Sequence, residues 1–308
     1  MQKKRLFQIV LPVLAAMIWG SAFVFQSVAA DSVDPFTFNA SRSIIAAVFL
    51  AIILIFKRRA PGSGKQRRGS RRKLFIGGIL CGTALFAASN LQQLGLGETG
   101  AGKAGFITAL YIVIVPVFGL FLRRRTSGLV WAGVALAVAG LYLLCVGSGF
   151  SIAASDLYLV LCALVFAAHI LIIDRFAPDV GGIELSCAQF AVAGILSFIC
   201  MLIFEDPDAA ALRGAAWSIL YVGIFSSGVA YTLQIIAQRY SDPAVVSLLL
   251  SLESVFAVIF GALILSERLS ARELTGCALM LAAVTLAQFP PRKKRAGISA
   301  EQPPLPGP

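Results

Sequence analysis

Long apolar runs separated by short polar segments make up almost the whole chain. A run of about 18 to 25 residues can cross a hydrocarbon core of roughly 30 Å as a helix that rises about 1.5 Å per residue. The pattern therefore predicts an all-α integral membrane protein with ten transmembrane helices and no soluble domain between them. The predicted helices are 6–30, 36–56, 74–97, 102–122, 128–146, 152–173, 183–204, 215–237, 243–265 and 274–289.

A carboxylate, Glu253, lies near the middle of the apolar run 243–265. An ionised side chain near the centre of a bilayer is costly, so it should face the bundle interior or a water-filled cavity and have a partner. This position points first to transport. The sequence leaves two roles for Glu253 open: a hydrogen-bonded brace between helices, and a group that loads and releases a proton. Tyr111 is a candidate partner for it.

The chain is 58% apolar and 13% charged, which is the balance of a membrane protein. Its net charge of +11 would suggest a nucleic-acid partner in a soluble protein, but the basic residues alternate by loop. With a cytoplasmic N-terminus, 21 of the 26 Lys and Arg residues fall on the cytoplasmic side, which is the positive-inside pattern. We therefore expect a multi-pass protein of the cell (inner) membrane with both termini cytoplasmic and no nucleic-acid partner. The basic segment 57–73 is also suited to bind anionic lipid.

The two ends of the chain need separate interpretations. Lys3, Lys4 and Arg5 followed by apolar residues resemble a secretory signal, yet the apolar part is 25 residues long against a usual length of roughly 7 to 15. We expect residues 6–30 to be retained as the first transmembrane helix. The segment 290–308 is basic and then proline-rich, which predicts a disordered cytoplasmic tail.

An internal repeat relates the two halves of the chain. With five helices in each half, an odd number, the second half must be inverted relative to the first, so we predict inverted repeats at 1–146 and 152–289. Inverted repeats that meet at a midplane site are the usual architecture of alternating-access transporters. A shift of 142 residues pairs Ala88 with Ala230, Leu91 with Leu233, Gln92 with Gln234, Leu110 with Leu252, Phe118 with Phe260 and Gly119 with Gly261; a shift of 147 pairs Leu14, Ala16 and Trp19 with Leu161, Ala163 and Phe166; and a shift of 143 pairs Gly133 with Gly276.

Four short motifs, in order and at consistent spacing, carry a family resemblance. Trp19-Gly20-Ser21 is similar to WGS, Arg42 begins an R-f-l-l-A-like stretch, residues 252–257 resemble L-E-P-V-F-A, and residues 266–270 stand at a G-E-x-L-T/S position. Over residues 6–289 the chain resembles the ten-helix, EamA-like branch of the drug/metabolite transporter superfamily. The resemblance implies secondary transport, mostly export, of small polar metabolites such as amino acids.

The chain departs from the family pattern at two of these motifs. Ser254 stands in place of a proline and Ser266 in place of a glycine, while Tyr111 occupies the position that the repeat assigns to the counterpart of Glu253. Loss of the proline predicts a straighter ninth helix. The resemblance also implies a cavity lined by helices one, three, four, six, eight and nine.

Aromatic faces and hydrogen-bonding groups at compatible depths are the candidates for binding a small polar or aromatic solute. Ordinary packing is the alternative for each, and for His169, the only histidine, the alternatives are a hydrogen-bonded packing role and a role with a proton or substrate. Lys103 either extends to the interface or attracts an anion, and Arg42 is expected to be a structural or topogenic charge. The substrate-binding candidates are Trp19, Phe23, Asn90, Gln93, Lys103, Tyr111, His169, Tyr231, Gln234 and Ser251.

Enzyme signatures are absent from the sequence. Residues 97–104 fit a phosphate-binding G-x-x-x-x-G-K pattern but end in Ala104, so the hydroxyl that would bind Mg²⁺ is missing. No second histidine could complete a catalytic or metal set, and the six cysteines lie inside apolar runs without metal-type spacing. We therefore expect a transporter without enzymatic activity, cofactor or metal. A membrane sensor or scaffold that binds a small ligand without moving it remains the alternative, and the oligomeric state is open, with a homodimer among the options.

Overall fold

The structure, a computed structural model, describes residues 2–59, 68–98, 101–124, 126–145, 155–265 and 270–289. Within these ranges the secondary structure is helical and contains no strand. The predicted tail 290–308, residues 60–67 of the basic segment and residues 266–269 of the last motif lie outside the described part.

The first half contains α1 (Gln2–Ala30), α2 (Pro35–Arg59), α3 (Arg68–Glu98), α4 (Ala101–Ala109), α5 (Tyr111–Phe121) and α6 (Gly128–Cys145). The second half contains α7 (Asp156–Phe176), α8 (Gly182–Phe204), α9 (Ala209–Gly214), α10 (Ala216–Tyr221), η1 (Val222–Ala230), α11 (Tyr231–Gln238), α12 (Pro243–Leu250), α13 (Glu253–Leu265) and α14 (Ala271–Ala287).

The membrane character of the sequence is retained in these helices. In the described residues, eight helical segments are long and apolar enough to cross a bilayer. The remaining two predicted spans correspond to shorter helices, α6 with 18 residues and α14 with 17. The chain is therefore an all-helical, multi-pass membrane protein.

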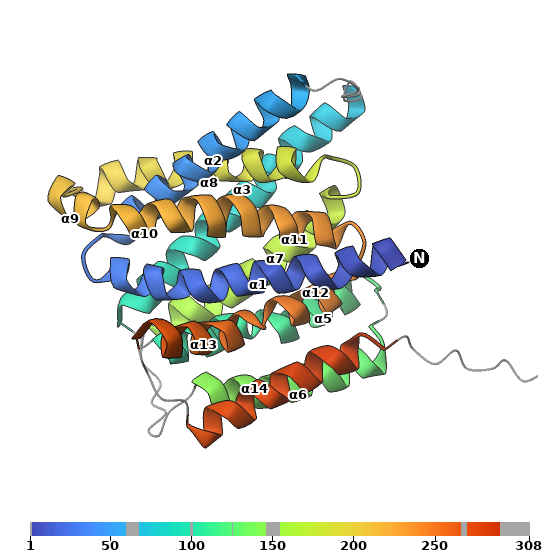
Figure 1. The fold of residues 1–308 in the computed structure, drawn as a ribbon. Coiled ribbons are helices and arrows are strands. Elements are labelled where there is room, and N and C mark those ends of the chain that lie inside the picture. The colour runs from blue at the N-terminus through green and yellow to red at the C-terminus, as the bar shows by residue number, and fades with distance from the viewer. Residues whose placement is uncertain are drawn as a thin grey trace, which may run out of the picture.

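The long helices run side by side along one direction, with α6 and α14 paired at one edge of the bundle (Figure 1). Helix α2 packs against α8, α3 packs against both α7 and α8, and α1 packs against α13 and against the rod formed by α10, η1 and α11. The chain thus places α1, α3, α7 and the α10–α11 rod around the interrupted segments α4–α5 and α12–α13.

Two of the predicted helices are interrupted near their middles. The predicted helix 102–122 divides into α4 and α5 at Leu110, and the predicted helix 243–265 divides into α12 and α13 at Ser251 and Leu252. At both places a backbone N–H bonds the carbonyl three residues earlier in the chain instead of four, as in a 3₁₀ turn. Leu110 N bonds Ile107 O at 3.2 Å, and Leu252 N bonds Leu249 O at 3.3 Å. Leu110 and Leu252 are the residues that the 142-residue shift superimposes.

A straighter ninth helix was predicted from the loss of the proline, yet the helix is interrupted at Ser251 and Leu252. The Ser251 hydroxyl donates to the Leu248 carbonyl at 2.8 Å, which is the carbonyl that the Leu252 N–H would reach in a regular helix. A serine side chain that bonds a preceding backbone carbonyl often bends a helix, although the same bond from Ser247 to Ala244 leaves α12 regular. The interruption therefore does not need the proline that Ser254 replaces.

Glycines allow the helices that surround these interruptions to approach closely. A Cβ atom on Gly20 would lie 2.5 Å from Phe256 Cβ and 2.7 Å from the Glu253 carbonyl oxygen, so the Trp19-Gly20-Ser21 motif packs directly on the motif that contains Glu253. Gly78 and Gly82 likewise bring α3 against Ala188 and Val192 of α8. This close approach is what the G-x-x-x-G spacing predicts.

Replacing Gly20 by alanine tests this contact. The added methyl group would overlap the α13 backbone, and overpacking of this kind destabilises a protein by about 1–3 kcal/mol. The matched control is Gly105→Ala in α4, where a Cβ would meet nothing within 4 Å and where alanine favours the helix. We expect denaturant unfolding in detergent to show a lower free energy of unfolding for Gly20→Ala and none of this loss for Gly105→Ala. Equal stability of the two variants would contradict the packing.

Candidate functional site

A cavity lies where the two interrupted helices meet α1, α3, α7 and the α10–α11 rod. The space open to the centres of water molecules is about 60 Å³, enough for a few waters at roughly 10–15 Å³ each. Its wall combines aromatic, amide, hydroxyl and charged side chains. The lining residues are Trp19, Phe23, Gln26, Arg42, Gln92, Thr108, Tyr111, Phe166, His169, Ile170, Ser226, Tyr231, Gln234, Leu250 and Glu253.

Tyr231 is the centre of the aromatic wall. Its ring lies 4.8 Å from that of Trp19, 6.1 Å from that of His169 and 5.3 Å from that of Phe190, each in an edge-on arrangement. The Trp19 indole N–H donates to the Ser226 carbonyl in the π-helix η1 at 3.2 Å. Such edge-on ring contacts and a bonded indole hold these side chains in fixed positions.

The internal repeat runs through the cavity wall. Ten of the lining residues form five pairs under the shifts that relate the two halves of the sequence. The sequence shifts therefore pair residues that line the same cavity, and some pairs, such as Tyr111 with Glu253, differ in chemistry while Gln92 and Gln234 are identical. The pairs are Trp19 with Phe166, Phe23 with Ile170, Gln92 with Gln234, Thr108 with Leu250, and Tyr111 with Glu253.

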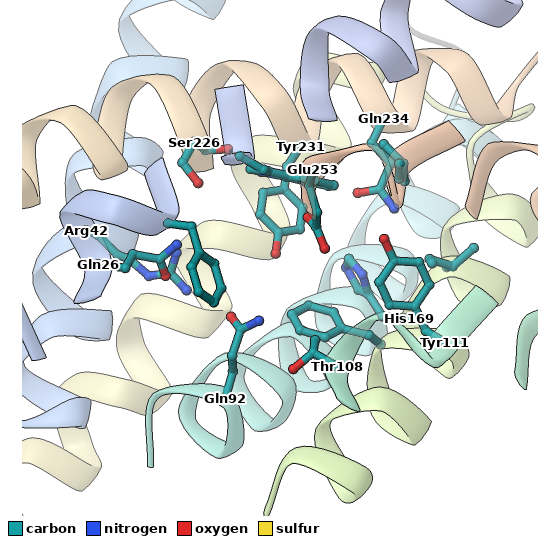
Figure 2. A pocket seen from close by; sticks show the side chains of 15 residues that line it. Gln26, Arg42, Gln92, Thr108, Tyr111, His169, Ser226, Tyr231, Gln234 and Glu253 are labelled. Carbon is teal, nitrogen blue, oxygen red and sulfur yellow. Dashed lines mark hydrogen bonds between the residues drawn. The ribbon is translucent and has the colours of Figure 1, made fainter. Parts of the chain in front are cut away.

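The cavity contains two side chains of opposite formal charge. In the view of Figure 2, Arg42 and Gln26 lie together on one side, Tyr231 lies between Arg42 and Glu253, and Tyr111 lies beyond Glu253. No ion pair joins Arg42 to Glu253 in the described residues. The two charges are therefore held apart across the site.

Some polar atoms of the wall are buried without a hydrogen-bond partner in the described residues. They are His169 Nδ1 and Gln234 Oε1, while the Tyr111 hydroxyl faces the Glu253 carboxyl group and Thr108 Oγ1 faces the Cys162 thiol without meeting strict hydrogen-bond geometry. A buried polar atom without a partner is costly unless water or a ligand pairs with it. The wall therefore presents donors and acceptors to whatever occupies the cavity.

His169 is fully buried and hydrogen-bonded. Its Nε2 lies 3.0 Å from Gln189 Oε1, so Nε2 carries the proton and Nδ1 is left as an acceptor. This bond agrees with the packing role considered for His169, while its presence in the cavity wall keeps the substrate role in view.

Four ion pairs gather at the end of the bundle near residues 174–184. Lys57 Nζ lies 3.0 Å from Glu184 Oε1, and Lys73 Nζ lies 2.8 Å from Asp179 Oδ2. The Lys73 ammonium holds the pKa of the Asp179 carboxyl below its usual range. The other two pairs are Arg124 with Asp174 and Arg175 with Asp179. The lining residues Gln26 and Gln92, in the C-terminal parts of α1 and α3, lie toward the opposite end of the bundle.

A family model supports the resemblance seen in the motifs. The EamA-like transporter family matches residues 6–146 and 153–289. The chain belongs to the EamA-like transporter family. An uncharacterized transporter of Archaeoglobus fulgidus is 32% identical over 92% of this chain and 86% of its own length. The uncharacterized inner membrane transporter YedA of Escherichia coli K12 is 24% identical over 91% of this chain and 92% of its own. A crystal structure at 18% identity shares the fold, with a TM-score of 0.75 over 91% of this chain and 96% of that chain.

Six of the ten substrate-binding candidates line the cavity of this EamA-like transporter, and Glu253 lines it with them. The six are Trp19, Phe23, Tyr111, His169, Tyr231 and Gln234. The other four lie elsewhere or outside the described side chains. Asn90 donates to the Phe86 carbonyl and Ser197, Ser251 bonds its own helix, Gln93 is buried outside the wall, and the side chain of Lys103 lies outside the described part.

Several residues of the wall were not among the candidates. The repeat already paired Gln92 with Gln234, and this pairing was the signal that could have selected Gln92. Arg42 was assigned a structural or topogenic role, yet it lines the cavity; a charge inside an apolar run was the available signal. Thr108, Gln26 and Ser226 carry no comparable sequence signal. In the described residues, no group of three or more His, Cys, Asp or Glu side chains could hold a metal ion.

Thiol labelling tests which end of the cavity is accessible in this EamA-like transporter. In a background whose native cysteines are replaced, we expect Gln92→Cys to react with a water-soluble thiol reagent. Ser247→Cys, a fully buried position on α12 toward the ion-paired end, should stay unreactive. Labelling can be followed by intact-protein mass spectrometry. Comparable labelling of both positions, or of neither, would contradict the described cavity.

Proposed function

We propose that this protein is a secondary transporter that exports small polar metabolites, such as amino acids, by alternating access. The observation that carries the proposal is the cavity at the two helix interruptions, where unpaired polar atoms and aromatic rings face one another. Discontinuous membrane helices at corresponding positions of two halves are characteristic of transporter binding sites. Export is the direction that the family resemblance implies.

The proposal includes two inverted repeats of five membrane helices, 1–146 and 152–289. The five residue pairs of the cavity wall and the matched interruptions at Leu110 and Leu252 support it. The contact between α6 and α14 supports it as well. Gly133 approaches the Ala283 carbonyl, and Gly140 approaches the Gly276 carbonyl. A shift of 143 residues relates Gly133 to Gly276 and Gly140 to Ala283, so the two contacts are equivalent under the repeat. With α6 and α14 counted as spans, ten membrane helices result, since about 17 residues suffice to cross.

The proposed topology places both termini in the cytoplasm. The basic loops then lie on the cytoplasmic side, together with the ion pairs near residues 174–184. In this arrangement the cytoplasmic end is closed and the cavity lies closer to the outer face. Transport would then require the three ion pairs that join the two repeats to separate as one repeat rocks against the other; these pairs are Lys57 with Glu184, Lys73 with Asp179 and Arg124 with Asp174.

Glu253 is proposed as the group that couples transport to protons. It stands in the cavity wall facing the Tyr111 hydroxyl, with which its carboxyl group interacts. A carboxyl group in such a partly dehydrated site can alternate between charged and neutral forms as the solute and the proton exchange. The residues proposed to contact the solute are Trp19, Phe23, Tyr111, His169, Tyr231 and Gln234.

Efflux from proteoliposomes tests the proposal. Vesicles loaded with mixed amino acids, nucleosides and organic acids should release a subset selectively, and release should depend on a pH gradient, as measured by mass spectrometry of the external medium. Glu253→Gln should abolish the gradient dependence, because the amide cannot carry the proton. The control Asp206→Asn changes an exposed loop carboxylate and should leave efflux unchanged.

Two other outcomes would change the account. Selective efflux that is indifferent to the gradient would leave a facilitator and remove the coupling role of Glu253. A folded protein that releases none of the loaded solutes selectively would contradict transport of these substrate classes.

A further inference from the structure

The buried arginine of the cavity is held in place by a hydrogen-bond network. Arg42 is only 4% exposed, and its Nε donates to Asn39 Oδ1 at 2.7 Å. Asn39 Nδ2 in turn donates to Asn90 Oδ1 at 3.0 Å, and Asn90 Nδ2 donates to Ser197 Oγ at 3.2 Å. The network joins α2, α3 and α8. The position of the guanidinium group is therefore fixed by three helices.

The outer part of this guanidinium group is free. The Nε bond uses one of its five N–H donors, and the four donors of the terminal nitrogens have no hydrogen-bond partner in the described residues. No described carboxylate lies within ion-pair distance of Arg42. The guanidinium carbon Arg42 Cζ lies over the ring of Phe38, 5.8 Å from its centroid, and this cation–π contact leaves the terminal N–H donors unused.

An unpaired buried cation is unfavourable, and its chemistry indicates what would neutralise it. A charge inside a membrane protein is stable when it is paired or faces a water-filled cavity. The planar guanidinium fork matches the two oxygens of a carboxylate or phosphate. Whenever Glu253, on the other side of this cavity, is ionised, it repels a doubly charged phosphate more strongly than a singly charged carboxylate.

We propose that Arg42 is an anion-binding subsite and that the solute carries a carboxylate. The carboxylate binds to the free donors of Arg42, and the rest of the solute lies along the rings of Trp19 and Tyr231 toward Glu253. An ammonium group on the solute would lie on the Glu253 side. That the bound carboxylate is the transported solute rests on the proposed transport function, whereas the binding of carboxylates to Arg42 can be tested without assuming transport.

Matched acids and amides provide the test. Binding of acetate and acetamide, benzoate and benzamide, L-alanine and L-alaninamide, and L-phenylalanine and L-phenylalaninamide would be measured by isothermal titration calorimetry on purified protein. We expect at least one acid to bind about tenfold or more tightly than its amide, since a hydrogen bond to a charged group contributes a factor of roughly ten to a hundred. If no acid binds more tightly than its amide, the proposal is wrong.

Three variants separate recognition from a merely structural role. Arg42→Gln should remove the preference for the acid, and Arg42→Lys should retain part of it, because the charge remains while the planar fork is lost. Asn39→Asp places a carboxylate beside the guanidinium and should weaken acid binding by competition, even in a protein that unfolds at the same temperature as the parent. Arg213→Gln, at an exposed position on α9, is the control and should bind like the parent.

The results also distinguish this inference from the transport proposal. If Arg42→Gln fails to fold, Asn39→Asp still decides the question, and unchanged acid preference in that variant would overturn the inference. Acid binding through Arg42 without any efflux would uphold the subsite and contradict transport. Selective efflux of solutes without a carboxylate, unaffected by Arg42→Lys, would uphold transport and contradict the subsite.

Discussion

A backbone that leaves the regular helix inside a bilayer is stable only where its polar groups meet protein or water. This constraint determines where the site can be. The interruptions at Leu110 and at Ser251 and Leu252 lie in the centre of the bundle, surrounded by α1, α7 and the α10–α11 rod, and the cavity forms between them. The close contact at Gly20 follows from the same constraint, because it covers the backbone at Glu253 with another helix.

Charged side chains inside the bundle are subject to the same constraint as its backbone groups, because each needs a partner or water. A membrane helix tolerates a charged residue only beside a partner or a cavity. Arg42 and Glu253 line the same cavity and do not form an ion pair with each other. Their separation leaves each free to interact with a solute, a proton or water, which is the physical basis of the proposed transport cycle.

The sequence was informative where a pattern has a physical cause. Apolar runs, basic loops and the repeat predicted a helical membrane protein, and the repeat paired residues that both line the cavity, such as Gln92 and Gln234. The interruption at Ser251 was missed because apolar periodicity does not reveal a local change in backbone hydrogen bonding, here the Leu252 N–H bonded to the Leu249 carbonyl. Asn90 was placed in the site because its depth is right, but depth alone does not show that its amide is used by Phe86, Asn39 and Ser197.

The central claim is that the cavity at the two interruptions is the path of the solute. Reversible modification of a single thiol in its wall tests this most directly. In a cysteine-free background, Gln92→Cys would be reconstituted and efflux measured before modification by a disulfide-forming reagent, after it, and after reduction. The account predicts loss of efflux on modification and recovery on reduction, with no effect at Leu161→Cys on the exposed face of α7. Unchanged efflux from fully modified protein would contradict it.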